Sequence, residues 1–303
     1  MHESPADAEI LLAAAGPAPD AGPSSVPPAE AAAEAEAQAG PDGAAGGDRL
    51  FVNALARGMA LLEAFDDGWQ AMGLSDLTRV TGLPLATVQR LTHTLATIGY
   101  LEKDGDSRRY RLTPRALGLT YRFLRSTPLY DAAIPIVVAF RDEWQETVNV
   151  SLLDGPDAVL LMRMPGAARL HPPSVIGRRM PAHATSTGLA QLSFLPPEEV
   201  DRRLGAAPLR ALTERTVVDP DRIRQRLETI RQRGYAVVEE EAAQGEMALA
   251  APILDQRGHP LAAIGVTLAT SHWTRARAER DLASGLMRAA ETIARNLVGW
   301  RAW

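Results

Sequence analysis

Hydrophobic positions along the chain recur with two different spacings. Three segments carry apolar residues at helical spacing, namely residues 52–65, 88–98 and 282–297. Alternating polar and apolar residues over 147–152, followed by an apolar run over 158–164, instead predict two strands. Helices and strands therefore occur in one chain, which predicts an α+β protein. The apolar helix positions are Val52, Leu55, Met59, Leu62 and Phe65, then Val88, Leu91, Leu95 and Ile98, and last Leu282, Leu286, Ala289, Ile293 and Leu297.

Two short helices joined by a tight turn are predicted between residues 74 and 98. The first covers residues 75–81, with Ser75 as its N-cap and Gly82 just past its end. Pro84 suits the first turn of the second helix. A strand hairpin rich in arginine follows and turns at residues 104–108. This order of elements is typical of a winged helix-turn-helix, which fits its second helix into a DNA groove.

The outward face of the second helix carries hydrogen-bonding groups and no large apolar side chain. Glutamine can pair with adenine, and arginine with guanine or phosphate. Arginines on the hairpin can reach phosphate or the minor groove. An ordinary solvated helix face, or a hairpin edge protected by its charge, is the alternative reading for each residue taken alone. We expect DNA contacts from Arg57, Ala86, Thr87, Gln89, Arg90, His93, Arg108 and Arg109.

Beyond the hairpin, the pattern predicts a linker helix and then a larger domain of strands and helices. The linker helix runs from Arg115 to Leu124, and Pro128 breaks it. A second helix containing Phe140 and Trp144 enters the larger domain. Further helices are predicted near residues 185–195, 198–204 and 221–233, and further strands at residues 235–239, 249–254 and 261–268.

Several short motifs, in a fixed order, resemble one known family. They include residues 56–65, Thr81-Gly82-Leu83-Pro84 and Gly99-Tyr100-Leu101 in the first half. The second half adds His183-Ala184-Thr185-Ser186-Thr187-Gly188 and Ala250-Ala251-Pro252-Ile253. Over about residues 50–298 the chain resembles the IclR family of bacterial transcriptional regulators. Two positions depart from the family pattern: Leu189, where lysine is common, and Ala248, where cysteine or serine is common.

The resemblance implies a division into four parts. These are a tail over residues 1–48, a winged helix-turn-helix DNA-binding domain over 49–114, a linker helix over 115–128 and an effector-binding domain over 129–303. The effector-binding domain is expected to be a GAF-like sheet flanked by helices, with a ligand pocket on one face. Linker helices in this family pair subunits, so we expect a homodimer or homotetramer on an inverted-repeat operator of double-stranded DNA. Repression and activation are both compatible with this arrangement.

The segment 185–188 stands at the start of a predicted helix, where free backbone N–H groups favour a carboxylate. Without the resemblance, the segment is equally a simple N-cap. His183 is expected to hydrogen-bond within the fold, and Arg163 either pairs with an anionic ligand or faces solvent. The resemblance implies an effector site formed by Met162, Arg163, Ser186, Thr187, Glu240, Glu241, Ala248, Gly265 and Thr267.

The expected effector is a small organic acid whose binding controls a catabolic operon. Residues 121–126 and 153–155 resemble the branch of the family that controls aromatic-acid catabolism. A benzoate-like carboxylate would suit a pocket with apolar walls and hydrogen-bond donors. Short keto acids such as glyoxylate or pyruvate, and sugar acids, are alternatives.

The net charge of −5 is unevenly distributed. Residues 1–48 contain nine acidic residues and no lysine or arginine, and alanine, proline and glycine dominate them. We therefore expect this tail to be disordered, either as an inert extension or as a competitor for basic surface. The remaining residues hold 32 basic and 28 acidic side chains, a net charge of +4. With no secretory signal and no long apolar span, we expect a cytoplasmic protein without a membrane partner.

Other function classes find little support in the sequence. The absence of cysteine excludes disulfides, thiol catalysis and thiolate metal sites. His171, His183 and His272 form no pair at metal-ligand spacing, so no metal site is expected. A nucleophile elbow, a phosphate loop and a dinucleotide fingerprint are all missing, so neither an enzyme nor a cofactor is expected. A protein-interaction adaptor that uses the helix-turn-helix only as a scaffold is the alternative.

Overall fold

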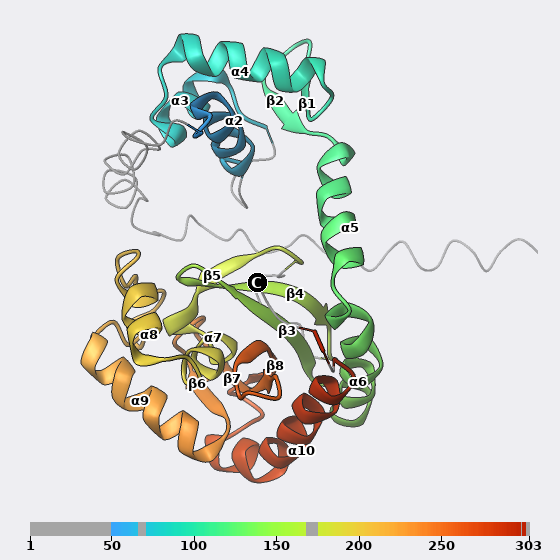
Figure 1. Cartoon of the computed structure of the whole chain (residues 1–303), viewed down its shortest axis with the longest axis vertical. Coiled ribbons are helices and arrows are strands. Elements are labelled where there is room, and N and C mark those ends of the chain that lie inside the picture. Colours follow the sequence, from blue (N-terminus) through green and yellow to red (C-terminus); the bar gives the residue numbers. More distant parts are fainter. Residues whose placement is uncertain (1–49, 66–70, 168–174, 298, 301–303) are drawn as a thin grey trace, which may run out of the picture. The chain divides into compact units, whose positions relative to one another are not determined.

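The computed structural model describes residues 50–65, 71–167, 175–297 and 299–300 (Figure 1). The expectations for the tail over residues 1–48 and for His171 lie outside these residues. The chain divides into two units between Leu119 and Thr120, and each unit is described by itself.

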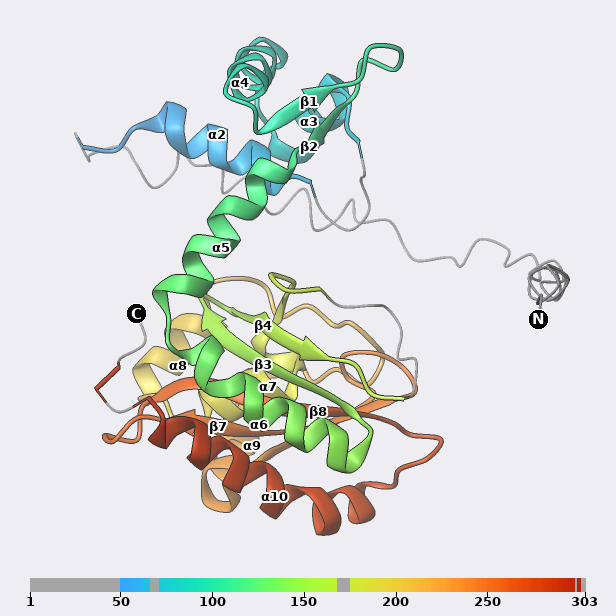
Figure 2. The ribbon, with the colours of Figure 1, turned by 90° about the vertical axis from the view of Figure 1, so that its right-hand side faces the viewer.

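The first unit is a helix-turn-helix followed by a two-stranded hairpin. Its core contains Leu61, Leu77, Val88 and Tyr110, contributed by three helices and the hairpin. The hairpin extends past its last paired residues as a loop that projects from the helices of this unit (Figure 2). The elements are α2 (Asn53–Glu63), α3 (Leu74–Thr81), α4 (Leu85–Thr97), β1 (Leu101–Lys103) and β2 (Tyr110–Leu112), followed by η1 (Pro114–Ala116) and by α5 (Leu117–Ser126), which runs across the division.

The helix starts of this unit differ in detail from the prediction. Gly73, not Ser75, is the N-cap of α3, because the Asp76 carboxylate accepts the Gly73 N–H at 3.0 Å. Gly82 ends the helix with a φ of +66°, as predicted for the residue after the last turn. Pro84 is the N-cap of α4 and not its first helical residue.

The buried stripes of α2 and α4 also differ from the predicted ones. In α2, Leu61 is buried while Leu55 and Met59 are exposed. In α4, Thr92 lies in the core between Val88 and Leu95, because its hydroxyl donates to the Val88 carbonyl and so needs no water. A buried threonine is thus compatible with the inner stripe, although its polarity predicts an outward position.

The second unit is a six-stranded antiparallel sheet covered by helices on both faces (Figure 1). Helices α6 and α10 pack on one face, and α7, with α8 and α9, covers the other. The strand order is β5-β4-β3-β8-β7-β6. The elements are α6 (Leu129–Trp144), β3 (Thr147–Asp154), β4 (Asp157–Met164), β5 (Arg179–Pro181), η2 (Ala182–Ala184), α7 (Ser186–Leu192), α8 (Pro197–Leu204), α9 (Pro220–Arg233), β6 (Ala236–Glu239), β7 (Glu246–Leu254), β8 (Pro260–Ala269) and α10 (Arg275–Arg295).

Two interior strands, β8 and β7, show why the sheet requires helices on both faces. Strand β8 is buried at every position from Pro260 to Leu268, and β7 is buried over most of its length. A strand that is apolar on both sides must be covered on both sides. The α+β class and the two predicted domain types, a winged helix-turn-helix and a helix-flanked sheet, are confirmed.

No single helix among the described residues is long and apolar enough to cross a membrane. The pair Pro114–Ser126 and Leu129–Trp144 reaches that length and composition only when joined, with a bend of 87°. Within the second unit, α6 contributes Ala133, Val137 and Phe140 to the core against the sheet.

Candidate nucleic-acid interface and effector cavity

The exposed face of α4 carries four of the predicted DNA contacts. Ala86, Gln89, Arg90 and His93 are exposed, and Thr87 is half-buried. In the part of the chain that the structure describes, the side chains of Gln89, Arg90 and His93 form no hydrogen bond or ion pair. Their donors are therefore available to base edges or phosphates.

The wing loop is ordered by one aspartate and presents an arginine at its tip. The Asp104 carboxylate accepts hydrogen bonds from both the hydroxyl and the N–H of Ser107, at 2.6 and 2.7 Å. The hydrogen bond from the Ser107 hydroxyl has the largest effect and the one from its N–H the next largest, and both lower the pKa of the Asp104 carboxyl. Arg108, the next residue, is fully on the surface with a φ of +57°. A positive side chain on an ordered tip is suited to a phosphate contact.

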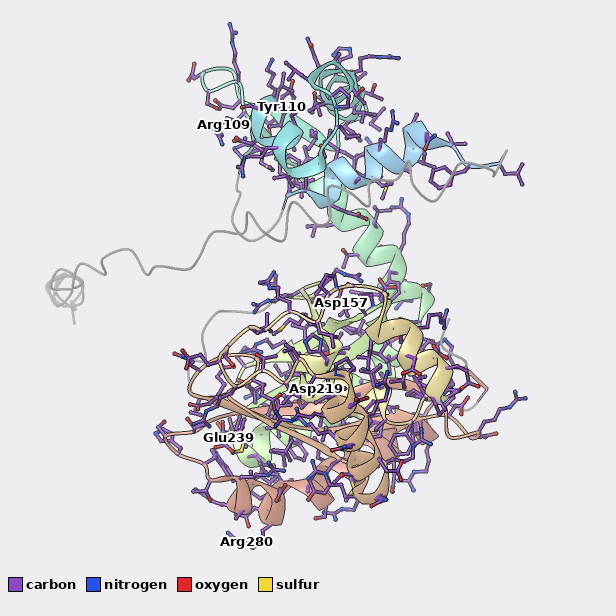
Figure 3. All side chains as sticks on the ribbon, turned by 90° about the vertical axis from the view of Figure 1, so that its left-hand side faces the viewer. Arg109, Tyr110, Asp157, Asp219, Glu239 and Arg280 are labelled. Atoms are coloured by element: carbon purple, nitrogen blue, oxygen red, sulfur yellow. The ribbon has the colours of Figure 1, made fainter. Side chains whose placement is uncertain are left out.

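Arg109 has a different position from Arg108. Its Nε donates to the Ala71 carbonyl at 3.0 Å, and its Nη2 bonds Asp76 Oδ2 at 2.7 Å. Asp76 also caps α3, so this arginine joins the base of the wing, beside Tyr110, to the start of that helix (Figure 3). Arg57 on α2 is half-buried, with its Nε enclosed by protein. Geometry thus favours Arg108 for direct contact and a supporting role for Arg109.

Replacing Arg109 by alanine is expected to destabilise the first unit by about 1–2 kcal/mol, because two hydrogen bonds of a half-exposed arginine are lost. Thermal unfolding of the full chain measures this change. The matched control is Arg108→Ala, which removes an exposed arginine and should leave the melting temperature unchanged. An unchanged melting temperature for Arg109→Ala, together with lost DNA affinity, would make Arg109 a DNA contact instead.

A cavity lies between the sheet and α7 in the second unit. It encloses about 830 Å³ of space not filled by atoms, including its opening to solvent. The sheet side is formed by Asn149, Ser151, Leu160, Arg163, Ala248 and Thr267. Met180 of β5 and Glu246 of β7 also belong to the sheet side, and the remaining wall includes Arg178, Ser186, Thr187, Ala242 and Ala243.

Arg163 provides this cavity with a positive charge. Within the described residues its guanidinium forms no hydrogen bond or ion pair. Burial lowers the pKa of Arg163, Glu246 acts in the opposite direction, and Arg178 lowers that pKa further. Arginine nevertheless keeps its proton in proteins, so this half-buried cation is suited to an anionic ligand in addition to the Glu246 carboxylate at the same cavity.

Three nearly buried hydroxyls line the same cavity. Ser151, Ser186 and Thr187 are only 5%, 4% and 6% exposed, and their hydroxyls form no hydrogen bond among the described residues. Buried polar groups normally have a partner in the protein or in solvent. Beside them, Asn149 Nδ2 donates to Thr267 Oγ1 at 3.2 Å, which leaves the threonine proton for another acceptor. The cavity therefore offers several donors to an oxygen-rich ligand.

Two family models match the chain. The model described as "Bacterial transcriptional regulator IclR C-terminal" matches residues 121–295, and the "IclR helix-turn-helix domain" matches residues 54–105.

The chain belongs to the IclR family.

The regulators of this family bind DNA and small-molecule effectors and are not enzymes. The chain is 34% identical over 254 residues to the Pca regulon regulatory protein of Pseudomonas putida, covering 84% of this chain and 87% of that protein. It is 32% identical to the transcriptional repressor IclR of Escherichia coli, and the match covers 71% of this chain and 80% of that protein. An IclR homologue of Microbacterium hydrocarbonoxydans, solved with 4-hydroxybenzoate, has 26% identity and a TM-score of 0.67, covering 80% of this chain and 98% of that one.

Of the nine effector residues that the family resemblance implies, the structure brings five to the cavity wall: Arg163, Ser186, Thr187, Ala248 and Thr267. Gly265 lies just beneath the wall, because a Cβ there would be 2.9 Å from Thr187 Cγ2. The glycine therefore lets α7 approach the sheet. The other three residues lie elsewhere.

Met162 is on the opposite face of the sheet from Arg163, so the prediction for it is wrong in this structure. It is 1% exposed and packs in the core beside its strand partner Val150. Neighbouring residues of a strand point to opposite faces, so both could not line one cavity. A register shift between Val150 and Ser151 places Leu160 and Arg163 together on the cavity side.

Glu240 and Glu241 do not line the cavity either. Glu241 is buried and forms an ion pair with Arg226 at 2.8 Å. Glu240 pairs with Arg215 at 3.1 Å and accepts the Gly245 N–H. Their carboxylates are occupied by protein groups, so they are unsuited to contact an organic acid.

The start of α7 offers fewer free backbone N–H donors to a ligand than the sequence predicts. The Thr185 hydroxyl accepts the Gly188 N–H at 3.1 Å, so the helix caps one of its own free donors. Arg163 and the three hydroxyls are therefore the stronger anion-binding groups. His183, buried just before this helix, contacts the Arg210 carbonyl through Nε2 at 3.2 Å, and burial lowers its pKa.

Several cavity residues were absent from the predicted site, among them Asn149, Ser151 and Arg178. The first two could have been found, because they are the polar positions of the alternating strand over 147–152. No local signal marks Arg178, which reaches the cavity only because its backbone pairs with Leu160. The described residues contain no group of three or more His, Asp or Glu side chains that could hold a metal ion.

Proposed function

We propose that this chain is a transcriptional regulator of a catabolic operon whose operator binding responds to a small organic acid. Two or four copies bind an inverted-repeat operator through the exposed face of α4 and the wing. The acid occupies the cavity of the second unit and changes operator affinity by as much as its own affinity differs between the two forms. The observation that carries this proposal is Arg163, a half-buried cation at the cavity wall that forms no hydrogen bond or ion pair among the described residues, although the Glu246 carboxylate lines the same cavity.

An aromatic acid is the effector class that we propose. A carboxylate would pair with Arg163, while Leu160, Met180 and Val238 provide apolar surface for a ring. The names of two relatives support this class: one is a Pca regulon regulator, and the other was solved with 4-hydroxybenzoate. Ser151 and Thr267 are available to a ring hydroxyl or a keto oxygen.

Thermal-shift measurements with benzoate, 4-hydroxybenzoate, protocatechuate, pyruvate, glyoxylate and gluconate distinguish the effector classes. A ligand selective for the native state stabilises it, by about 2.7 kcal/mol at 100 times its Kd. We expect the largest shift from one of the three aromatic acids. A shift with pyruvate, glyoxylate or gluconate alone would contradict the aromatic class while retaining an acid-binding site.

Arg90→Ala is expected to weaken operator binding by about 1–3 kcal/mol if this exposed α4 side chain reads a base. Fluorescence anisotropy with DNA from upstream of the chain's own gene, at several salt concentrations, measures the affinity and its salt dependence. The matched control is Arg79→Ala, an exposed arginine of α3 beside Asp76. No salt-sensitive, sequence-dependent binding by the wild type would contradict the regulator itself and favour an adaptor.

A further inference from the structure

The loop between β6 and β7, residues 240–245, forms part of the cavity wall. Ala242 and Ala243 are the loop residues that line the cavity. Alanine side chains cannot reach far, so their distance from a ligand depends on the position of the loop backbone. Whatever holds this backbone therefore shapes the cavity.

The loop closes on itself through its first residue. Glu240 has a φ of +56°, a left-handed conformation that is uncommon for a residue with a side chain. Its N–H donates to the Glu246 carbonyl at 2.7 Å, and its Oε1 accepts the Gly245 N–H at 3.0 Å. These contacts join the two ends of the loop, but they do not attach it to the rest of the domain.

The loop is attached to the domain by the Glu240–Arg215 ion pair at 3.1 Å and by the Thr270 N–H, which donates to the Gly245 carbonyl at 2.9 Å. Its least exposed attachment is the ion pair between Glu241 and Arg226. Two nitrogens of the guanidinium bond the two carboxylate oxygens, each at 2.8 Å, and Arg226 also donates to the Val237 carbonyl of β6 at 3.3 Å. Bidentate pairs of this kind fix direction as well as distance. Because the Glu241 side chain is only 9% exposed, solvent does little to screen the pair.

The segment between α8 and α9 binds the backbone of the same two glutamates. The Thr213 hydroxyl donates to the Glu240 carbonyl at 2.6 Å, and the Thr216 hydroxyl donates to the Glu241 carbonyl at 2.7 Å. The Val217 N–H also reaches Glu241 Oε2, at 3.5 Å. Side-chain and backbone groups of Glu241 are thus both held, on the side of the loop away from the cavity.

We propose that Arg226 and Glu241 are positioning residues that set the shape of the effector cavity without touching the ligand. Their ion pair holds the 240–245 loop so that Ala242 and Ala243 stay at the cavity wall. The cavity then discriminates between smaller and bulkier acids, because the ion pair fixes the position of Ala242 and Ala243 at its wall. The ligand part of this inference rests on the proposed acid-binding function, whereas the loop part does not.

Hydrogen–deuterium exchange on the full-length protein tests the loop part without any ligand. Arg226→Gln and Glu241→Gln should each raise exchange of peptides covering 240–246 by about tenfold or more, because local opening becomes easier. Exchange in α10 should stay unchanged. Arg224→Gln is the matched control, since Arg224 lies on the same helix but, within the described residues, pairs only with exposed Asp201 and Asp221.

A charge-exchange double variant distinguishes a positioning role of the ion pair from a general loss of stability. The charge exchange Arg226→Glu with Glu241→Arg should restore most of the loop protection that either single exchange removes. Should the charged-pair variants not fold, Thr213→Val removes a hydroxyl bond to the loop without leaving a buried charge, and should raise exchange about threefold. Wild-type exchange in the loop of both Arg226→Gln and Thr213→Val would overturn the proposal, and so would an equal rise in α10.

Calorimetric titration with 4-hydroxybenzoate and with the bulkier 1-hydroxy-2-naphthoate tests the ligand part. The Glu241→Gln variant should lose about tenfold or more in the ratio of the two affinities, because the wall no longer discriminates by size. An unchanged ratio, with increased loop exchange, would overturn the role in selectivity. If the wild type binds neither acid, the proposed effector class fails, while the exchange data still decide whether the ion pair holds the loop.

Discussion

Replacing Arg163 by methionine is expected to weaken binding of the effector acid by about ten- to 150-fold, or about 1.5–3 kcal/mol. The guanidinium is half-buried in the cavity and forms no ion pair or hydrogen bond among the described residues; Glu246, which lines the same cavity, acts on its charge without pairing with it. A ligand carboxylate would provide that partner in a charge-assisted, bidentate geometry. Methionine retains much of the length and apolar surface, so the change tests mainly the charge.

The same substitution is expected to leave the ligand-free protein as stable as before, or to make it more stable. Burial already lowers the pKa of Arg163, which means that folding disfavours its charged form. Removing a strained functional group commonly stabilises a protein at the expense of its function. A structural arginine would show the opposite, a lower melting temperature.

Calorimetric titration and thermal unfolding measure these two effects separately. Arg288→Met is the matched control, because Arg288 is exposed on α10 against the opposite face of the sheet. It should change neither acid affinity nor stability. Unchanged acid affinity in Arg163→Met would remove the assignment of Arg163, and with it the main support for an anionic effector.

Replacing Gly188 by alanine is expected to destabilise the second unit by about 3 kcal/mol, because the added methyl group overlaps backbone atoms. A Cβ on Gly188 would lie 2.5 Å from the Ala182 Cα and would also overlap the Ala182 carbonyl oxygen. Neither atom can rotate away as a side chain could. Helix α7 would have to move from η2, and Ser186 and Thr187 would move with it.

Thermal unfolding should show a fall of about 6–12 °C in the transition of a unit of this size. Gly285→Ala makes the same chemical change in the interior of α10, where the new Cβ meets side-chain atoms alone, the Phe140 ring at 3.4 Å and the Arg288 guanidinium at 3.9 Å, among the described residues. That variant should be neutral or up to about 1 kcal/mol more stable, because alanine is the better helix former. Similar losses in both variants would show that close approach of α7 and η2 is not the cause.

The positions of the helices and strands could be predicted because each depends on the spacing of nearby side chains. Gly82 ends α3, and the alternating strand at residues 147–152 lies within β3, as expected. It was harder to predict which of two neighbouring residues would be the N-cap of a helix. Both Ser75 and Gly73 could begin α3, and the Asp76 carboxylate decided for Gly73 by accepting its N–H.

The effector site could be predicted only in part. A family motif points to Ser186 and Thr187, and both line the cavity; their contact with an effector stays a prediction. A motif does not show which face of a strand a residue occupies when the register shifts, and Met162 was therefore misplaced. It also does not show whether a charge is already paired, as Glu241 is with Arg226.

The amino-acid sequence by itself determined the type of each domain, the exposed polar face of α4 and the family to which the chain belongs. These properties follow from periodicity and from short motifs, in which the interacting groups are neighbours along the chain. Only the tertiary structure decided which charges are paired. Arg163 lines the cavity and forms no ion pair with any described residue, whereas Arg109 and Glu241 are paired with Asp76 and Arg226. Arg226 and Glu241 are 15 residues apart in the sequence, and Arg109 and Asp76 are 33 apart. Each pair comes together only when the chain folds, so no local sequence pattern predicts it.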